Sequence, residues 1–300
     1  GAGRPEAIYA IERLLDAAAH DIGVSPIEIR KQNFIPSDAM PFSTILGSNY
    51  DSGEFQRNLE DAVIHSNWKD FDSRKVAAKN RGKLLGIGMA SYIERCAGGS
   101  PEEARLEISS EGHVTLYIGT MSNGQGHETA FRQILCENLG IGFDDISIVQ
   151  GNSDLIETGG GTMGSRSVPI GGSAIGAASK RIIEKAKETA AEILESAISD
   201  IEFDSGEYRI VGTDRAVNFQ RIAKAAAKGS DVAFNEKESF APEEATYPNG
   251  THVCELEIDE ATGEIKLVDY TVVDDFGKVI NPLLLEGQVH GGIAQGLGQA

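Results

Sequence analysis

The chain has 300 residues, of which 40% are hydrophobic and 24% charged, a composition typical of a globular protein with a sizeable core. Its formal net charge of −19 argues against partners that are themselves anionic, such as nucleic acids or acidic membrane surfaces. The three cysteines, Cys96, Cys136 and Cys254, form no CxxC pair, which argues against a zinc or iron–sulfur site made by this chain alone. No apolar run is long enough to cross a membrane, and the cysteine content fits a reducing cytoplasm best.

The first third of the sequence predicts helices followed by a β-hairpin. Residues 5–19 place apolar side chains on one helical face, and Ser25 with Glu28 forms a capping box that opens a second short helix. The run 36–53 is rich in Pro, Ser, Asn and Gly and predicts a loop. The remaining predictions in this region are a helix at 54–69, a strand at 84–93 and the two strands of a hairpin at 105–109 and 114–118.

The rest of the chain continues to mix helices and strands. Residues 228–250 are polar and predict a long surface connection. The other predictions are loops at 119–127 and 150–170, helices at 128–138 and 173–199, and strands at 146–149, 254–258 and 265–272. Phe203, Tyr208 and Ile210 are also typical of strand. Because strands and helices do not alternate regularly, the pattern predicts an α+β fold with mixed sheets and packed helices rather than a doubly wound sheet.

Two glycine-rich segments combine backbone freedom with polar side chains. Ser122–Glu128 follows a predicted strand and opens a helix, so its amides and Gln125 can approach a ligand, and His127 with Glu128 can form an acid–base or metal-ligand pair. Thr158–Ser167 precedes the long helix, and its N–H groups, its hydroxyls and Arg166 suit a phosphate. Taken alone, the first segment is also compatible with a simple glycine turn and the second with a flexible surface loop.

Two further glycine turns lie at expected helix starts, Gly1–Glu6 and Glu286–Gly292, although the second is also compatible with close helix packing through small residues. Four such turns in one chain favour a single extended anionic ligand held mainly by the backbone. The sequence has no HExxH spacing, no G-x-S-x-G motif and no Walker-type loop, so nothing in it favours a zinc protease, a serine hydrolase or a P-loop enzyme.

In this order, the segments resemble the molybdenum-cofactor-binding large subunit of the xanthine dehydrogenase, aldehyde oxidase and carbon monoxide dehydrogenase family. The resemblance covers most of the chain and is carried by Gly1–Glu6, Arg30–Pro36, Tyr50–Gly53, Gly124–Glu128, Gly161–Ser167 and Val279–Gly298. It implies the two-domain cofactor-binding region of these hydroxylases, with residues 1–80 as the C-terminal part of the first domain and residues 81–300 as the second, truncated at its C-terminus. The chain is therefore expected to be an internal fragment that is inactive alone.

The resemblance implies a molybdopterin cofactor, possibly as its cytosine dinucleotide, whose dithiolene sulfurs hold the metal, so no metal-ligating side chain is expected. Gln125 is implied to contact an oxo ligand of molybdenum, and Gln288 to approach the pterin–molybdenum end. The implied cofactor-binding residues are Gly1, Ala2, Gly124, Gln125, Gly126, His127, Gly161, Thr162, Gly164, Ser165, Arg166, Ser167 and Gln288.

The implied reaction is hydroxylation of an aldehyde or N-heterocycle with oxygen from water, with electrons leaving through iron–sulfur clusters and FAD on partner subunits. The family's general-base glutamate lies in a motif with no counterpart before Ala300, so no base is assigned in this chain. Members that oxidise carbon monoxide carry a cysteine in the loop that corresponds to Gly1–Gly3, and purine-oxidising members place an aromatic residue near Ala2. The alternatives are carbon monoxide dehydrogenase-like oxidation, a non-catalytic scaffold module of the same complex, and an unrelated nucleotide-binding enzyme.

Overall fold

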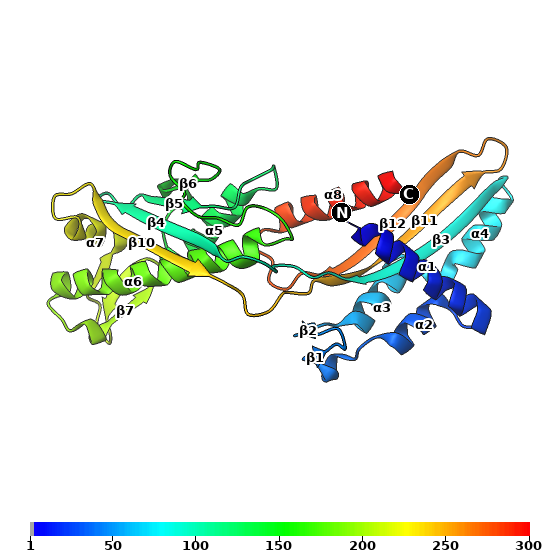
Figure 1. The fold of residues 1–300 in the computed structure, drawn as a ribbon, viewed down its shortest axis with the longest axis horizontal. Helices are drawn as coiled ribbons and strands as arrows, with labels where there is room; N and C mark the ends of the chain where they lie inside the picture. The colour runs from blue at the N-terminus through cyan, green and yellow to red at the C-terminus, as the bar shows by residue number, and fades with distance from the viewer. Residues whose placement is uncertain (1–2) are drawn as a thin grey trace. The chain divides into compact units, whose positions relative to one another are not determined.

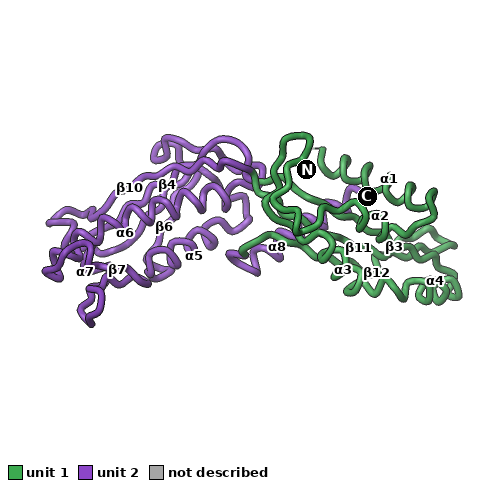
Figure 2. The backbone as a smooth tube through the Cα atoms, turned by 90° about the horizontal axis from the view of Figure 1, so that it is seen from below, with its two compact units in different colours: residues 1–96, 245–278 green, residues 97–244, 279–300 purple. Residues whose placement is uncertain are grey.

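The computed structural model describes residues 3–300 and divides into two compact units, each assembled from two separate stretches of chain (Figures 1 and 2). Unit 1 joins residues 1–96 to residues 245–278, and unit 2 joins residues 97–244 to residues 279–300. Both units combine helices with sheets, so the predicted α+β class is confirmed. The boundary expected after residue 80 separates two family domains along the sequence, whereas these units are defined by contacts in space, so that boundary stays a prediction. In the part of the chain that the structure describes, no helix has the length and apolar character needed to span a membrane.

Unit 1 is built on a three-stranded antiparallel sheet in the order β12-β11-β3 (Figure 1). Val253 of the central strand pairs with Met89 of β3, and both pack against Leu59 and Ala62 of α3 in a buried cluster. The elements of unit 1 are α1 (Arg4–Ile22), α2 (Pro26–Asn33), η1 (Ser37–Ala39), β1 (Phe42–Ser43), β2 (Asn49–Tyr50), α3 (Phe55–His65), η2 (Trp68–Asp70), α4 (Phe71–Lys79), β3 (Lys83–Ile93), β11 (Asn249–Asp259) and β12 (Ile265–Asp275).

The first two helices follow the capping signals in the sequence. Gly23 ends α1 in the left-handed conformation, at φ 76°, which a residue without a side chain adopts at little cost. Ser25 Oγ then accepts a hydrogen bond from Glu28 N at 3.1 Å, as the predicted capping box requires. The sequence prediction missed α4, which follows α3 after the short turn of η2.

Unit 2 is built on a four-stranded sheet in the order β10-β4-β5-β6. Leu106 and Ile108 of β4 and Leu116 and Ile118 of β5 alternate with half-buried residues and join one core cluster with α5 and α6. The elements of unit 2 are β4 (Glu102–Ser109), β5 (Val114–Ile118), α5 (His127–Leu139), η3 (Phe143–Asp145), β6 (Ile146–Val149), the π-helix η4 (Ser167–Gly172), α6 (Ser173–Leu194), η5 (Ile198–Asp200), β7 (Ile201–Asp204), β8 (Glu207–Ile210), β9 (Ala216–Asn218), α7 (Phe219–Ala226), β10 (Val232–Phe240) and α8 (Pro282–Gln299).

Four predictions for unit 2 need correction. The polar run 228–250 is not a plain connection, because it contains β10, which pairs antiparallel with β4 and buries Phe234 and Glu236. The long alanine-rich helix α6 ends at Leu194, where Glu195 takes the left-handed conformation, rather than at residue 199. The loop predicted at 150–170 ends at residue 166, because η4 continues directly into α6. The last helix begins at Pro282 behind an Asn281 cap, so Glu286–Gly292 lies inside α8 and is no helix start.

Candidate functional site

Two glycine-rich loops leave the sheet of unit 2 at one edge. We call residues 119–126, which follow β5, the first glycine loop, and residues 150–166, which follow β6, the second glycine loop. β5 and β6 are parallel neighbours, with Leu116 opposite Ile148. Because parallel neighbours end at the same edge of a sheet, the two loops emerge side by side, as ligand-binding loops do in α/β folds.

The first glycine loop turns sharply into α5. Gly124 and Gly126 both have positive φ, at 101° and 83°, and Gly126 is the N-cap residue of α5. Between them, Gln125 is half-buried, and its Oε1 accepts a hydrogen bond from Asn123 N at 2.5 Å. The side-chain oxygen of Gln125 is thus used by the loop itself, and its Nε2 group remains available as a donor to a ligand.

His127, the first residue of α5, is buried and stacks on Phe131 with ring centroids 5.2 Å apart. Burial lowers the pKa of the His127 imidazole, which favours its neutral form. Gln150 Nε2 lies 3.4 Å from His127 Nδ1, and because an amide NH₂ group can only donate, this contact places the ring proton on Nε2. Glu128 is exposed, so the structure gives no support to an acid–base pair of His127 and Glu128.

Acidification is expected to destabilise the protein partly through His127. Because burial lowers the His127 pKa, the unfolded chain takes up a proton before the folded chain does, so this contribution to stability is present above the unfolded pKa of about 6.5 and is lost as the pH falls through the folded pKa. Urea unfolding at about pH 7.5 and about pH 5.5 should therefore show a smaller loss of stability for His127→Gln than for the wild type. His65→Gln, at an exposed position of α3, is the control, and equal losses in all three proteins would contradict the prediction.

The second glycine loop presents a run of backbone donors. Gly161, Gly164 and Ser165 have positive φ at 70°, 55° and 53°, so the peptide planes change direction repeatedly. Within residues 3–300, no protein acceptor receives a hydrogen bond from the five amide N–H groups of residues 161–165. An added Cβ at Gly161 or Gly164 would meet no atom within 4 Å, so the loop borders open space. Successive N–H groups in turns of this kind form a concave anion-binding nest.

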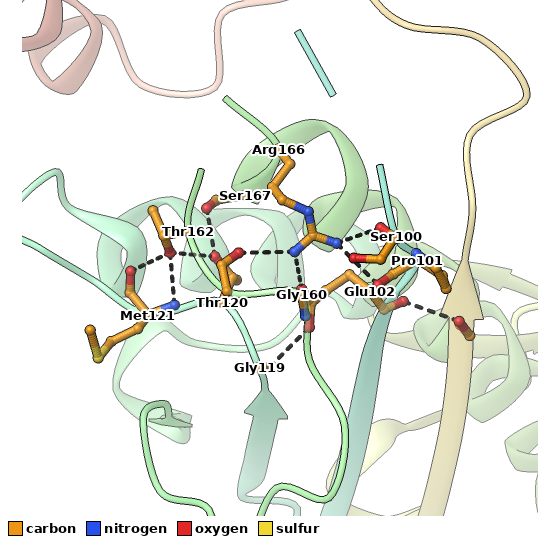
Figure 3. A network of polar contacts seen from close by, with 12 residues as sticks. Ser100, Pro101, Glu102, Gly119, Thr120, Met121, Gly160, Thr162, Arg166 and Ser167 are labelled. Carbon is orange, nitrogen blue, oxygen red and sulfur yellow. Dashed lines mark hydrogen bonds and ion pairs between the residues drawn. The ribbon is translucent and has the colours of Figure 1, made fainter. Parts of the chain in front are cut away.

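A chain of hydroxyl groups connects the two glycine loops (Figure 3). The Oγ1 atoms of Thr120 and Thr162 lie 2.9 Å apart, and Ser167 Oγ lies 2.5 Å from Thr120 Oγ1. Thr162 donates its single proton to Met121 O at 2.6 Å, so Thr120 must donate to Thr162 and Ser167 to Thr120. Gln150 adds a 2.5 Å hydrogen bond from its Nε2 to Thr120 O. Thr162 and Ser167 of the sequence prediction are therefore joined through Thr120.

Arg166, the last residue of the second glycine loop, extends toward Glu102 (Figure 3) and has only 2% of its surface exposed. Its Nη1 atom forms a 2.5 Å ion pair with Glu102 and donates to Gly161 O at 2.9 Å, and its Nη2 atom donates to Ser100 O at 2.7 Å and Pro101 O at 3.0 Å. Both terminal nitrogens are thus bound to protein acceptors, and Nε is buried without a partner in the described residues. The role of Arg166 in phosphate binding, expected from the resemblance, stays a prediction.

The remaining predicted residues lie apart from this pair of loops or outside the description. Gln288 is exposed on α8, and none of the described contacts joins it to either glycine loop. The start of α8 does approach the site, because an added Cβ at Gly126 would lie 2.5 Å from Leu284 Cδ2. Gly1 and Ala2 lie outside the described residues. Among residues 3–300, no group of three or more His, Cys, Asp or Glu side chains could hold a metal ion.

Three residues of the site were missed by the sequence analysis: Glu102, Thr120 and Gln150. Each is a single polar residue at the end of a strand or just after one, and its sequence neighbours do not distinguish it from other polar residues at such positions. The one usable signal for Thr120 and Gln150 is their position, because both follow the carboxyl ends of adjacent strands. That signal requires the parallel pairing of β5 with β6, which the sequence alone did not establish.

Comparison with known proteins assigns the fold to a family. A family model described as a molybdopterin cofactor-binding domain matches residues 61–300, and a second with the same description matches residues 1–34. The carbon monoxide dehydrogenase large chain of Hydrogenophaga pseudoflava is 33% identical over 97% of this chain, and 39% of the relative is covered. The 6-hydroxypseudooxynicotine dehydrogenase complex subunit gamma of Paenarthrobacter nicotinovorans is 31% identical over 99% of this chain and 39% of its own length.

A solved structure extends the likeness to three dimensions. Quinoline 2-oxidoreductase from Pseudomonas putida 86 superposes with a TM-score of 0.90 at 31% identity, covering 98% of this chain and 40% of the other. The chain thus spans about two fifths of the length of the relatives that it matches. Since the first family model alone matches residues 61–300, the chain belongs to the molybdopterin cofactor-binding domain family of the molybdenum oxidoreductases.

Proposed function

We propose that the two glycine loops bind a molybdopterin cofactor and that the chain is the cofactor-binding part of a molybdenum hydroxylase large chain. The nest of five N–H groups at residues 161–165 carries this proposal, because it offers donors to an anion and borders open space. Gln125 supports it from the first glycine loop, where its Nε2 group is available to a ligand beside the start of α5.

The donor set of the site fits such a cofactor. A phosphate needs several convergent N–H and hydroxyl donors, and the second glycine loop offers its amides together with the exposed Ser165. When bound, the cofactor supplies two-electron redox chemistry that transfers oxygen from water to an electron-poor carbon.

The residues of this chain would bind and orient the cofactor. The second glycine loop would hold the phosphate end, and Gln125 would donate a hydrogen bond at the reactive end. The hydroxyl chain from Ser167 through Thr120 to Thr162 would hold the two loops at a fixed position relative to each other. His127, buried at the start of α5, would hold the first glycine loop in place. No general base is assigned to this chain.

The substrate and partners proposed for the whole protein follow the relatives. An aldehyde or N-heterocycle is the proposed substrate class, in line with a quinoline 2-oxidoreductase and a 6-hydroxypseudooxynicotine dehydrogenase subunit among the matches. The second candidate is carbon monoxide oxidation, which the identity of 33% to a carbon monoxide dehydrogenase large chain favours. Against it, the loop that carries a cysteine in carbon monoxide-oxidising members corresponds by resemblance to Gly1–Gly3, which reads Gly-Ala-Gly. We also propose a cytosine dinucleotide form of the cofactor, partner subunits with iron–sulfur clusters and FAD, and a cytoplasmic location.

The proposal is tested by measuring pterin and molybdenum per polypeptide after expression of the full reading frame, with its partner subunits, in a host that makes molybdopterin. Amounts near one of each per chain support it. A folded complex with neither contradicts it and favours the scaffold alternative.

Gly161→Ala places a methyl group in the open space at the nest and is expected to lower pterin content about tenfold. Gly263→Ala is the matched control, because Gly263 has a similar φ of 74° and equally open surroundings in the β11–β12 turn.

A further inference from the structure

Glu102 is a buried carboxylate that binds both glycine loops of unit 2 through three donor groups. It is the first residue of β4 and is 1% exposed. Its Oε1 atom accepts a hydrogen bond from Gly119 N at 3.2 Å, and its Oε2 atom accepts from Gly160 N at 3.1 Å and from Arg166 Nη1 at 2.5 Å (Figure 3). A single side chain is therefore bonded to the backbone of both glycine loops and to the Arg166 side chain of the second.

The two glycine loops touch at the point that Glu102 bridges. An added Cβ at Gly119 would lie 2.3 Å from Gly159 Cα and 2.7 Å from Glu102 Oε1, so the backbones are in direct contact beside the carboxylate. Gly119 N, at this contact, and Gly160 N, one residue beyond it, both donate to the carboxylate. Because one carboxylate accepts both, the distance between the loops is fixed by the width of a single carboxyl group.

The position of Glu102 also determines where the nest begins. Gly160 is the last residue before the nest whose amide is bound to the protein, and the following five amides have no protein acceptor within residues 3–300. Arg166 balances the negative charge of Glu102. The Glu102 carboxylate next to the nest therefore does not repel an anionic ligand bound by the nest amides. Because its charge is neutralised by Glu102, Arg166 adds little net positive charge to the second glycine loop.

We propose that Glu102 is a positioning residue of the cofactor site, which sets the spacing of the two glycine loops and the direction of the nest amides without touching the cofactor. The inference rests on the proposed function. Arg166 acts with Glu102 in this role, through its hydrogen bonds to the carbonyl groups of Ser100, Pro101 and Gly161. The side-chain hydrogen bonds of Glu102 are to loops rather than to the apolar core of unit 2, which packs around Leu106, Leu116 and their neighbours. Its loss should therefore act on the loops first.

Hydrogen exchange of the cofactor-free full-length chain tests the local part of this proposal. In Glu102→Gln the side chain keeps its size, but one amide oxygen cannot replace the two carboxylate oxygens that accept from Gly119, Gly160 and Arg166. Exchange is expected to rise about tenfold or more at the hydrogen-bonded amides of Gly119, Gly160 and Arg166 and to stay unchanged in the core of β4 and β5. Glu107→Gln is the matched control, since Glu107 lies on the same strand with a half-exposed pair to Arg105. A rise throughout unit 2, or none in the loops, overturns the positioning role.

Pterin content of the holoenzyme tests the functional part. Glu102→Gln is expected to retain about 10- to 100-fold less pterin than the wild type, the usual scale for residues that support a site from behind, whereas Glu107→Gln should match the wild type. Wild type and Glu102→Gln loaded equally would overturn the positioning role. An unloaded wild type would instead refute the proposed function, so the two failures are distinguishable.

Glu102→Asp tests whether the length of the side chain matters in addition to its negative charge. Glu102→Asp keeps the balance with Arg166 and protects the proposal against a Glu102→Gln chain that fails to fold. It cannot reach Gly119, Gly160 and Arg166 together, because it is one methylene shorter. The expected pterin content lies between those of the wild type and Glu102→Gln, with raised exchange in the same two loops. Complete recovery by aspartate would show that only the charge matters and would overturn the inference.

Discussion

Replacing Arg30 by methionine is expected to lower the free energy of unfolding of unit 1 by about 3–5 kcal/mol, because it leaves a buried carboxylate without its partner. Arg30 is 1% exposed and joins three elements. Its Nε atom donates to Glu12 Oε2 on α1 at 2.8 Å, its Nη2 atom donates to Asp16 Oδ1 at 2.9 Å, and its Nη1 atom donates to Pro26 O at 2.9 Å. A further contact of 3.3 Å to Met89 O connects this cluster to β3.

The measurement is urea unfolding followed by fluorescence of Trp68, the single tryptophan of the sequence, which packs against the core cluster of unit 1. Arg13→Met is the matched control. Arg13 pairs with the same Asp16 at 3.4 Å but its side chain is 66% exposed, so its loss should change the unfolding free energy by no more than about 0.5 kcal/mol. If both substitutions cost the same, the buried cluster does not stabilise unit 1 and the prediction is wrong.

Local patterns were sufficient to predict the regular parts of the fold. The alternation of Leu106 with Ile108, and of Leu116 with Ile118, predicts strands with one buried face, and these residues are buried in the structure. Ser25 and Glu28 likewise marked a helix start correctly, because a capping bond involves residues only three positions apart. Such patterns involve only a few neighbouring residues, so they do not depend on which other segments pack against them.

Contacts between distant segments could not be predicted in the same way. β10 was missed because Glu236, Lys237 and Glu238 read as a polar surface run, and only pairing with β4 makes them a strand. Glu102 was missed for the same reason, since its partners lie 17, 58 and 64 residues further along the chain. Glycine-rich composition indicated both glycine loops, but not the carboxylate and hydroxyls that join them.

Arg30 and Arg166, the two arginines that are buried among residues 3–300, have different roles. Arg30 connects secondary-structure elements of unit 1, and its loss is a matter of stability. Arg166 is equally buried, yet its acceptors are a carboxylate and three carbonyl groups around the glycine loops of unit 2. An arginine beside a glycine-rich loop in a sequence favours a phosphate ligand, whereas the same residue in the structure is bound to the protein.

Gly140→Ala is expected to destabilise unit 2 by about 3–5 kcal/mol, through backbone strain and a clash that cannot be relieved by rotating a side chain. Gly140 is the C-cap residue of α5, at φ 64°. An added Cβ there would lie 2.1 Å from both Gly206 N and Ser205 C in the β7–β8 turn. Gly206 is equally confined, since its own Cβ would lie 2.4 Å from Gly140 O.

Gly212→Ala is the control that measures the backbone strain without the clash. Gly212 lies in the same unit at φ 76°, but an added Cβ there would meet no atom within 4 Å, so only the left-handed conformation is penalised, by about 1–2 kcal/mol. Urea unfolding followed by far-ultraviolet circular dichroism should separate the two variants by about 2–3 kcal/mol. Equal midpoints would mean that the β7–β8 turn moves aside freely. Because α5 carries the first glycine loop at its other end, a fixed contact at Gly140 holds the helix that presents Gln125 and His127.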